Sequence, residues 1–342
     1  MKKKMLIVFG ITLLITVKIT ISCQKETIPT ETIQSLTYSI SGNKIINQNQ
    51  PIQLIGVNAF HSFSAGSNDM SNWNIDVVRE FIGNVKENPI DGNPIQDTNG
   101  SYLHSLQKIV DGNRLNNKVT ILCAFGWDGT NVNLYTGKRP TQTFWWNDYK
   151  IKLQQWATFF KNQPDVWIEV WNEPYNYNRT DGYTDAIWMS DMNELTQVVR
   201  AAGNANIILI PCCEQGQDES VVVNQGANFL NNKSNIIFDI HAYEKWLLID
   251  DSTNQNRLEV LKQNNLPIIF GETAPMNAGV LMNPQSFLNI LYNRGLSVCA
   301  WTWKNDETDQ DALLTTTGLL NNINNNNWGS IYKELTTRVR NP

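Results

Sequence analysis

Residues 166–174 read Val-Trp-Ile-Glu-Val-Trp-Asn-Glu-Pro, an apolar run that ends in two polar residues and a proline. A short apolar run bounded by such a turn signal is typical of a strand buried in a parallel sheet. Seven further segments have the same character, and helical patterns such as residues 149–162 and 188–202 lie between them. The eight predicted strands span residues 53–58, 76–82, 119–125, 166–173, 207–212, 236–243, 268–272 and 297–303.

Eight strands that alternate with helices favour a closed (β/α)₈ TIM barrel over an open, doubly wound α/β sheet. No glycine-rich phosphate loop follows the first strand, which argues against a dinucleotide-binding fold. Residues 38–46 resemble a hairpin that turns at Gly42-Asn43. We therefore expect one barrel domain over residues 36–342.

The first 22 residues have the pattern of an export signal. Three lysines at positions 2–4 precede an apolar run over residues 5–17, which is too short to span a membrane comfortably. Small residues then precede Cys23, as in a bacterial lipoprotein signal, and residues 23–35 would form a polar tether. We expect a cell-surface or periplasmic lipoprotein that contacts the membrane only through a lipid on Cys23. An ordinary cleaved signal peptide, and hence a secreted protein, is the alternative.

The charge and the aromatic content indicate a neutral partner. The net charge is −5, and the four lysines of the first 22 residues leave about −9 on the remainder, so the sequence predicts no nucleic-acid partner. The chain holds 12 tryptophans, whose indole faces stack well on sugar rings, although core packing is an equally good reason for any one of them. We expect a monomer that binds a polysaccharide.

Four cysteines remain beyond Cys23, and none has the spacing of a metal site. They show no CxxC pattern and no histidine at ligand spacing, and each lies in or at the end of an apolar run, at positions Cys123, Cys212, Cys213 and Cys299. Buried free thiols are therefore predicted. We expect neither a metal ion nor another cofactor.

Polar residues of catalytic types follow several of the predicted strands. The fourth strand ends in Asn172-Glu173, the sixth in His241 and Tyr243, and the seventh in Glu272. In a (β/α)₈ barrel these strand ends meet at one rim, where active sites collect. Two carboxyl groups at one rim suit glycoside hydrolysis, in which one protonates the leaving oxygen and the other stabilises or attacks the sugar.

The sequence resembles glycoside hydrolase family 5, the cellulase and β-mannanase family, over roughly residues 38 to 335. Its two signatures are Val170-Trp171-Asn172-Glu173-Pro174 and Phe270-Gly271-Glu272. Further similarity lies at residues 56–58, 78–79, 240–243 and 301–304. The resemblance implies that Glu173 is the acid/base and Glu272 the nucleophile. It also implies that Asn172 binds the 2-hydroxyl of the sugar that is cleaved.

The resemblance assigns roles to four more residues. Arg79, His241 and Tyr243 would orient the two carboxylates and keep Glu272 ionised. Trp303 would be the stacking platform beneath the sugar. Trp303 alternates with Trp301 at period two, so both are expected to point toward the barrel interior or its mouth.

One position departs from the family pattern. The family usually has a histidine at the end of the third strand, where this chain has Ala-Phe-Gly-Trp-Asp over residues 124–128. Trp127 or Asp128 would then supply a different sugar contact. His61, which follows the first strand, is a further candidate to line the cleft.

The leading hypothesis is a retaining endo-β-1,4-glycanase that hydrolyses β-mannan or a β-glucan such as cellulose. An exo-acting β-glycosidase is the alternative among enzymes, and it would have a cleft that is blocked at one end. A non-catalytic surface lipoprotein that binds glycan is the alternative from another class. A binding protein has no need for a matched acid and nucleophile, so the sequence favours the enzyme.

Overall fold

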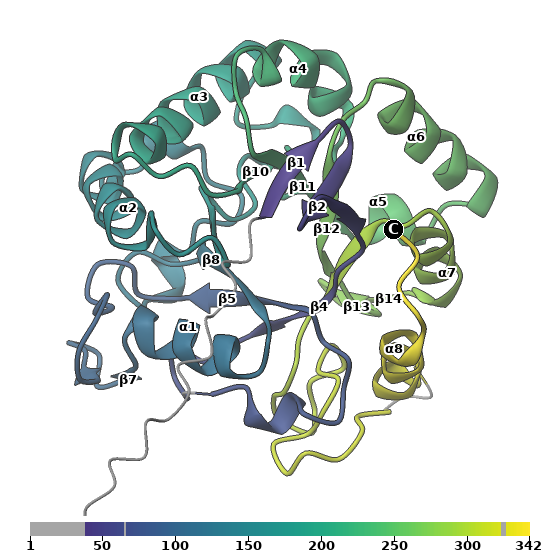
Figure 1. The fold of residues 1–342 in the computed structure, drawn as a ribbon, viewed down its shortest axis with the longest axis horizontal. Helices are drawn as coiled ribbons and strands as arrows, with labels where there is room; N and C mark the ends of the chain where they lie inside the picture. Colours follow the sequence, from purple (N-terminus) through teal and green to yellow (C-terminus); the bar gives the residue numbers. More distant parts are fainter. Residues whose placement is uncertain (1–37, 65, 323–325) are drawn as a thin grey trace, which may run out of the picture. The chain divides into compact units, whose positions relative to one another are not determined.

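The computed structural model describes residues 38–64, 66–322 and 326–342, and in this part of the chain eight parallel strands close into a barrel (Figure 1). The predicted signal peptide and tether, residues 1–35, lie outside the described residues. The closed barrel confirms the predicted (β/α)₈ fold. Its strands, in barrel order, are β4 (Ile55–Ala59), β5 (Val77–Ile82), β8 (Val119–Ala124), β9 (Val166–Glu169), β10 (Ile208–Pro211), β11 (Ile236–Ala242), β12 (Ile268–Thr273) and β15 (Ser297–Ala300).

The helices form a ring around this barrel (Figure 1). Between β4 and β5 the described chain has only a 3₁₀ turn, Asn68–Met70, where a regular barrel has a helix. That connection is rich in Ser, Gly, Asn and Asp, which favour turns over helix interiors. The helices are α1 (Leu106–Leu115), α2 (Trp146–Phe160), α3 (Asp185–Ala201), α4 (Ser220–Leu230), α5 (Glu244–Leu247), α6 (Asp251–Gln263), α7 (Gln285–Asn293) and α8 (Trp328–Thr337).

Two barrel strands end earlier than the sequence predicts. Strand β9 stops at Glu169 rather than at residue 173, and β15 stops at Ala300 rather than at residue 303. Beyond Ala300 the backbone turns to the loop that follows it, where the Thr302 N–H donates to the Asp311 carbonyl. Period-two alternation therefore does not extend to residues 301–303, because it holds only within a strand.

A small antiparallel sheet covers the end of the barrel where the strands begin. It consists of β1 (Tyr38–Ser41), β2 (Lys44–Asn47) and β3 (Gln50–Ile52), and the predicted turn at Gly42-Asn43 joins its first two strands. Its apolar side chains pack on residues near the strand starts, among them Val77 and Val119. Two short ladders, β6 (Ile95–Gln96) with β7 (Tyr102–Leu103) and β13 (Met276–Asn277) with β14 (Val280–Leu281), lie in loops after β5 and β12.

The main core lies between the barrel wall and the helices, and tryptophan makes up much of it. Six of the tryptophans are among the largest fully buried side chains: Trp156, Trp167, Trp171, Trp188, Trp246 and Trp328. For these six the core-packing interpretation holds, since a side chain without exposed surface cannot stack on a sugar. All four described cysteines are also buried free thiols, as predicted.

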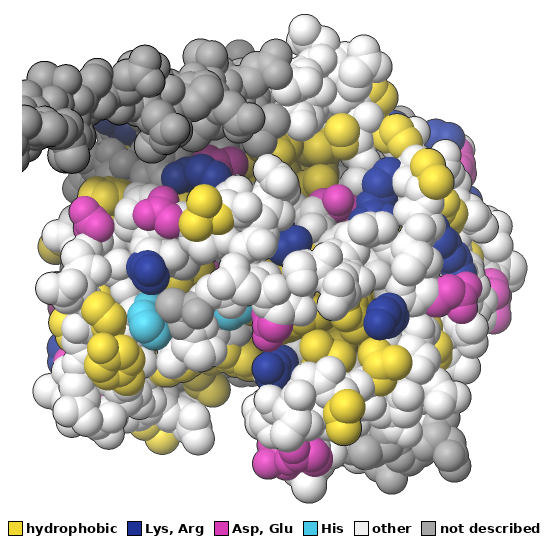
Figure 2. All heavy atoms as spheres, turned by 60° about the horizontal axis from the view of Figure 1, so that its bottom comes forward, with side chains coloured by type: hydrophobic (Ala, Val, Ile, Leu, Met, Phe, Trp, Pro, Cys, Tyr) yellow, Lys and Arg dark blue, Asp and Glu magenta, His cyan; other side chains and the backbone are white. Residues whose placement is uncertain are grey.

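The surface carries charges of both signs. Figure 2 shows one face on which acidic and basic side chains are interspersed among uncharged ones. Such a mixture gives this face no strong attraction for a polyanion. In the described part of the chain, no helix has the length and hydropathy needed to cross a membrane.

Candidate active site

Glu173 and Glu272 lie at the end of the barrel where the strands terminate. Glu272 is the fifth residue of β12, and Glu173 lies in the loop after β9. The backbone of Glu173 has a φ of 48°, a left-handed conformation that costs a non-glycine residue about 1 kcal/mol or more. Two hydrogen bonds hold it there, from the Gly137 N–H to its carbonyl (2.7 Å) and from the Thr136 hydroxyl to its carboxylate (2.9 Å).

The two carboxyl groups meet at the imidazole of His241. The Nδ1 atom of His241 lies 2.8 Å from Oε1 of Glu173 and 3.5 Å from Oε2 of Glu272. One carboxylate oxygen of each glutamate and a ring nitrogen of His241 all lie within 4.8 Å of one another. The structure thus brings together three of the residues that the sequence assigned to the site.

An irregularity in the barrel places His241 beside Glu272. Along the β11–β12 pair, Ile240 is opposite Phe270, but the next residue, His241, is opposite Glu272, so Gly271 is an extra residue. The Gly271 N–H donates to the Asp239 carboxylate at 2.6 Å, and a Cβ at Gly271 would lie 2.1 Å from that carboxylate. Only glycine fits here, which explains why a glycine precedes Glu272 in the Phe-Gly-Glu signature.

A second glycine, Gly216, contacts His241 from the other side. Gly216, in the loop after β10, has a φ of +80°, and its carbonyl accepts a hydrogen bond from the His241 N–H at 2.8 Å. A Cβ at Gly216 would lie 2.7 Å from the imidazole ring. The backbone of this loop therefore limits how far the imidazole can move.

The guanidinium of Arg79, on β5, donates hydrogen bonds to several polar side chains of the site. It donates from Nη1 to Glu272 (2.6 Å) and from Nη2 to Asn172 (2.8 Å). Nε and Nη2 also bind both oxygens of Glu169, at 2.6 and 2.8 Å, and Nη1 binds Asn58 at 2.8 Å. All five N–H donors of the guanidinium thus have an oxygen acceptor, which fixes its plane and its position.

Burial and neighbouring charges set the ionisation of Glu272. Burial raises the pKa of Glu272, as does the charge of Glu173, whereas His241 and Arg79 act in the opposite direction. The Tyr243 hydroxyl donates to Glu272 at 2.8 Å, which also favours the carboxylate. Burial and the charge of Glu272 raise the pKa of Tyr243 well above its ordinary value, so this hydroxyl remains a neutral donor.

The pKa values of His241 and Glu169 are shifted as well. Burial opposes the charge on His241, but Glu272, Asp239 and Glu173 outweigh it and raise the His241 pKa well above its ordinary value. His241 is therefore a cation that lies between carboxylates. Burial raises the pKa of Glu169 to about 7 although Arg79 favours its charged form.

The end of β8 differs from the sequence-based expectation. Phe125 occupies the place next to the site, with the Arg79 guanidinium 5.1 Å from its ring centroid and the Trp301 ring stacked on it at 5.4 Å. Trp127 is only 5% exposed and packs parallel to Trp145 at 6.3 Å, away from the hydrogen-bonded carboxylates. The Asp128 carboxylate binds residues of its own loop.

The two tryptophans after β15 have different environments. Trp303 is 2% exposed and lies edge-on to Trp73 at 5.0 Å. Trp301 is partly exposed, and its ring packs with Phe60 and Phe125. Of the two, Trp301 has more surface available for a ligand, whereas the resemblance assigned the platform to Trp303.

Several residues of the site were not found from the sequence. Asn58 lies in a stretch of similarity to the family, Thr136 lies in a loop without a recognisable pattern, and Asp239 lies within the sixth predicted strand. Asp239 precedes His241 by two residues on β11, and this period-two spacing is a signal that could have revealed it. Glu169, within the fourth predicted strand, binds Arg79 through both of its carboxylate oxygens.

Two triads of side chains have the spacing of metal ligands: Glu169, Asp239 and His241, and Glu173, His241 and Glu272. Arg79 and Tyr243 already donate to carboxylates in both triads. A cation would have to compete with the positive charges of Arg79 and His241. The expectation that the protein needs no metal stays a prediction.

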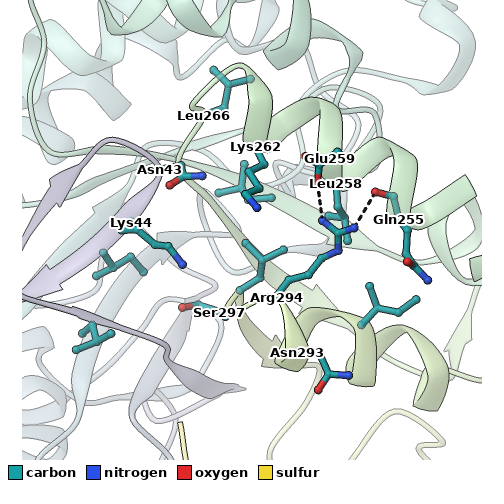
Figure 3. Close-up of a pocket in the computed structure, with 16 residues that line it drawn as sticks. Asn43, Lys44, Gln255, Leu258, Glu259, Lys262, Leu266, Asn293, Arg294 and Ser297 are labelled. Atoms are coloured by element: carbon teal, nitrogen blue, oxygen red, sulfur yellow. Dashed lines mark hydrogen bonds and ion pairs between the residues drawn. The ribbon is translucent and has the colours of Figure 1, made fainter. Parts of the chain in front are cut away.

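A large cavity lies away from these residues. It has a volume of about 600 Å³ and is bordered by the first residues of β12 and β15, Ile268 and Ser297, and by α6, α7 and the β1–β2 turn. Figure 3 shows Arg294 at this cavity, bound to Glu259 and Gln255. The strand starts form the opposite end of the barrel from Glu173 and Glu272, so this cavity belongs to no part of the candidate active site.

We predict that Arg79→Met lowers the free energy of unfolding by about 3–5 kcal/mol, because it leaves buried carboxylates without their cation. The loss should be larger at pH 8 than at pH 5. Without Arg79 the folded Glu169 binds its proton more tightly than the unfolded residue does, so the variant loses stability as the pH rises above the ordinary glutamate pKa. Urea unfolding at both pH values measures this.

Arg114→Met is the matched control, because Arg114 also binds a carboxylate through two nitrogens, that of Asp165, but is partly exposed. Its loss should be about 1 kcal/mol or less. Equal losses in the two variants would contradict the role given to the Arg79 cluster.

Two proteins of known activity are similar in sequence to this chain. A mannan endo-1,4-beta-mannosidase of Salipaludibacillus agaradhaerens is 20% identical over 281 residues, which cover 81% of this chain and 84% of that protein. The beta-mannanase/endoglucanase A of Caldicellulosiruptor saccharolyticus is 22% identical over 178 residues, 50% of this chain but only 12% of that much longer protein. Sequence similarity thus extends over most of the barrel.

Among solved structures, a mannotriose complex of the Thermomonospora fusca beta-mannanase has a TM-score of 0.66 at 18% identity, and the match covers 88% of this chain and 95% of that chain. At this identity the likeness shows the fold. The family described as "Cellulase (glycosyl hydrolase family 5)" matches residues 45–307. Because that match covers most of the chain and includes both glutamates, the protein belongs to glycosyl hydrolase family 5.

Proposed function

We propose that the protein is a retaining endo-β-1,4-glycanase that hydrolyses β-mannan or β-glucan by double displacement. The observation that carries this proposal is the pairing of Glu173 and Glu272 across His241, with carboxylate oxygens within 4.8 Å. Retaining enzymes have carboxyl groups about 5–5.5 Å apart, whereas inverting enzymes need about 6.5–9.5 Å to admit a water. The short separation supports direct attack by one carboxylate.

In the first step Glu173 protonates the glycosidic oxygen while Glu272 attacks the anomeric carbon from the opposite face. The bond to the leaving sugar breaks and a covalent glycosyl–Glu272 ester forms. In the second step Glu173 accepts a proton from a water that attacks the same carbon. The carbon–oxygen bond to Glu272 then breaks, and the sugar leaves with its original anomeric configuration.

The surrounding residues support these roles. Arg79 and Tyr243 both donate to Glu272 and so keep the nucleophile ionised and oriented. The Asn172 amide oxygen accepts from Arg79, and its NH₂ group donates to Thr136 at 3.0 Å and to Glu173 at 3.5 Å, which places the amide beside the acid/base. Trp301, partly exposed beside Phe125, is a better candidate than Trp303 for the platform under the sugar.

β-Mannan is the first candidate substrate. The relatives and solved structures named above are mannanases or a mannanase/endoglucanase, and this supports the same class of polymer here. The mixed surface charge suits an uncharged polymer. Phe125 in place of the histidine found in the family alters the wall next to Arg79, so the choice between mannan and glucan needs a direct assay.

Export of the protein follows from the same proposal. A polymeric glycan does not cross a membrane, so the enzyme has to reach it outside the cytoplasm. We propose that residues 1–22 direct export and that a lipid on Cys23 anchors the protein to a membrane. The barrel contains its site within one chain, in agreement with a monomer.

Product analysis on mannan, glucomannan, carboxymethyl-cellulose, mixed-linkage glucan and xylan tests the proposal. We expect mixed oligosaccharides from mannan, glucan or both early in the reaction, and none from a Glu272→Gln variant. Release of a single short product from chain ends would instead indicate exo action. No product on any polymer would contradict the function.

Azide should distinguish the roles of the two glutamates. We predict that Glu272→Ala and Glu173→Ala each lose about 10³-fold or more of the wild-type rate, and that azide restores turnover of an aryl glycoside in both. With Glu272→Ala the azide takes the place of the nucleophile and gives an α-glycosyl azide. With Glu173→Ala it attacks the glycosyl enzyme and gives a β-glycosyl azide. NMR of the products measures the configuration, and the opposite pattern would exchange the two roles.

The Tyr243 hydroxyl should set the acidic limb of the pH–activity profile. Activity requires ionised Glu272, so it is lost as the pH falls through the Glu272 pKa. Tyr243→Phe removes a hydrogen bond that favours the carboxylate, so we predict that the acidic limb moves to higher pH. The pH dependence of kcat/KM measures this. Tyr292→Phe, which removes a hydroxyl bound to the distant Val339 carbonyl, should leave the limb in place.

A further inference from the structure

The two ends of the barrel differ in charge. Lysines lie near the strand starts, where the helices end, whereas the loops after the strands are rich in acids. Residues 305–311, in the loop after β15, hold four acidic side chains and no basic one. The strand-start end has lysines that form no ion pair in the described part of the chain: Lys44, Lys161, Lys233 and Lys262.

Acidic side chains at the strand-start end are paired with arginines. The pairs, with their N···O distances, are Asp76–Arg340 (2.6 Å), Asp165–Arg114 (2.7 Å) and Glu259–Arg294 (3.2 Å). Such pairs add no net charge, so the unpaired lysines leave this end positively charged. The chain as a whole has a net charge of −5, so its excess of acids lies toward the catalytic end.

The large cavity at the strand starts lies within this positively charged end. Figure 3 shows Lys44, from the small sheet, and Lys262, from α6, at the same cavity. Apolar side chains such as Ile45, Leu258 and Ile268 also line it. Its volume of about 600 Å³ is enough for a small ligand. Ammonium groups beside apolar surface suit a molecule that carries both an anionic group and a hydrocarbon part.

Helix dipoles give only part of the reason for these lysines. A cation near the last turn of a helix is favourable, and Lys161, Lys233 and Lys262 lie at or near the ends of α2, α4 and α6. Lys44 lies on β2 and has no such reason. The field of a helix end falls off within about one turn, whereas a full charge acts over about 8 Å at physiological ionic strength. The excess charge is therefore available to a partner.

We propose that the strand-start end of the barrel docks on an anionic phospholipid membrane, with a lipid phosphate at the cavity beside Lys44 and Lys262. The candidate active site then faces away from the membrane, toward a polymer in the medium. The same anionic surface repels the acidic loops at the catalytic end, which favours this orientation over the reverse. The contact needs no hydrolytic activity, so it goes beyond the proposed function.

The connection to Cys23 agrees with this orientation. Strand β1 begins at Tyr38 and belongs to the small sheet that covers the strand-start end. Residues 24–37 therefore join Cys23 to this end of the barrel, and their extended length is at most about 50 Å. A lipid on Cys23 and the unpaired lysines act on the same end, so the lysines add a second contact to the membrane anchor.

Vesicle sedimentation of the full chain with Cys23→Ser, which prevents lipidation, tests this inference. We expect binding to vesicles of equal parts phosphatidylglycerol and phosphatidylcholine to be at least about tenfold tighter than to phosphatidylcholine alone, and to be lost at about 0.5 M salt. Lys44→Gln/Lys262→Gln should weaken binding to the anionic vesicles about 30-fold, because each lysine near such a surface contributes about 1 kcal/mol.

Lys86→Gln/Lys108→Gln is the matched control. It removes the same charge at the catalytic end, because Lys86 lies in the loop after β5 and Lys108 in the first turn of α1, and neither forms an ion pair in the described chain. Its affinity for the vesicles should stay within about threefold of the parent. Residues 1–22 are the same in every variant, so differences between variants report on the barrel.

Each outcome supports or overturns the membrane contact. Equal binding to both kinds of vesicle, or equal losses in the two double variants, overturns it. Lysine-dependent binding to polygalacturonate without binding to vesicles also overturns it, and would make an anionic polysaccharide the partner. Vesicle-bound protein should hydrolyse soluble polymer as fast as free protein does, and a loss on binding would contradict the orientation. If the protein hydrolyses nothing, the proposed function fails, but the vesicle measurements still decide the contact.

Discussion

The guanidinium of Arg79 is the interaction on which the site depends. Its five N–H groups hold Glu272, Asn172, Asn58 and both oxygens of Glu169, so four residues from β4, β12 and the end of β9 take their positions from one rigid plane. Without this cation the buried carboxylates would have no counter-charge, and burial raises the pKa of Glu169 to about 7 even in its presence. A lysine could not replace it, because an ammonium has only three N–H donors on one atom and cannot reach the five acceptors that the planar guanidinium binds.

Because Arg79 is fixed, it lies at a constant distance from Glu272 and lowers the pKa of that carboxyl group. Burial alone would favour a neutral Glu272, and Arg79, His241 and Tyr243 each act against this. The extra residue at Gly271 brings His241 opposite Glu272, and the Gly216 backbone limits the movement of the imidazole on its other side. The local features that look irregular, two glycines and the left-handed Glu173, are therefore those that bring the two carboxyl groups together.

The sequence predicted the barrel and the residues at its strand ends because both depend on local patterns. Buried strands show as apolar runs, and a polar residue at the end of such a run is visible without coordinates. Asn58 and Thr136 could not be assigned in this way, since their roles come from contacts with residues far away in the chain. The expectation that Trp303 is the platform was supported by a pattern that the structure does not continue as far as residue 303. The pattern predicts side chains that alternate in direction beyond Ala300, but there the backbone bonds to the loop at Asp311 instead of to a neighbouring strand.

The tryptophans show how the same residue type serves both stability and the site. Six are fully buried and form part of the core that offsets the cost of the charged cluster inside the barrel. Trp301 lies past the end of β15, where it stays partly exposed while its ring packs against Phe60 and Phe125. Phe125 then matters twice: it packs on Trp301 and contacts Arg79, so the aromatic wall and the carboxylate cluster share one side chain. A polar residue at this place would have to compete for the donors of Arg79, all of which already have acceptors. An aromatic ring does not compete, so all five N–H donors of the guanidinium stay hydrogen-bonded to the carboxylates and amides that Arg79 positions.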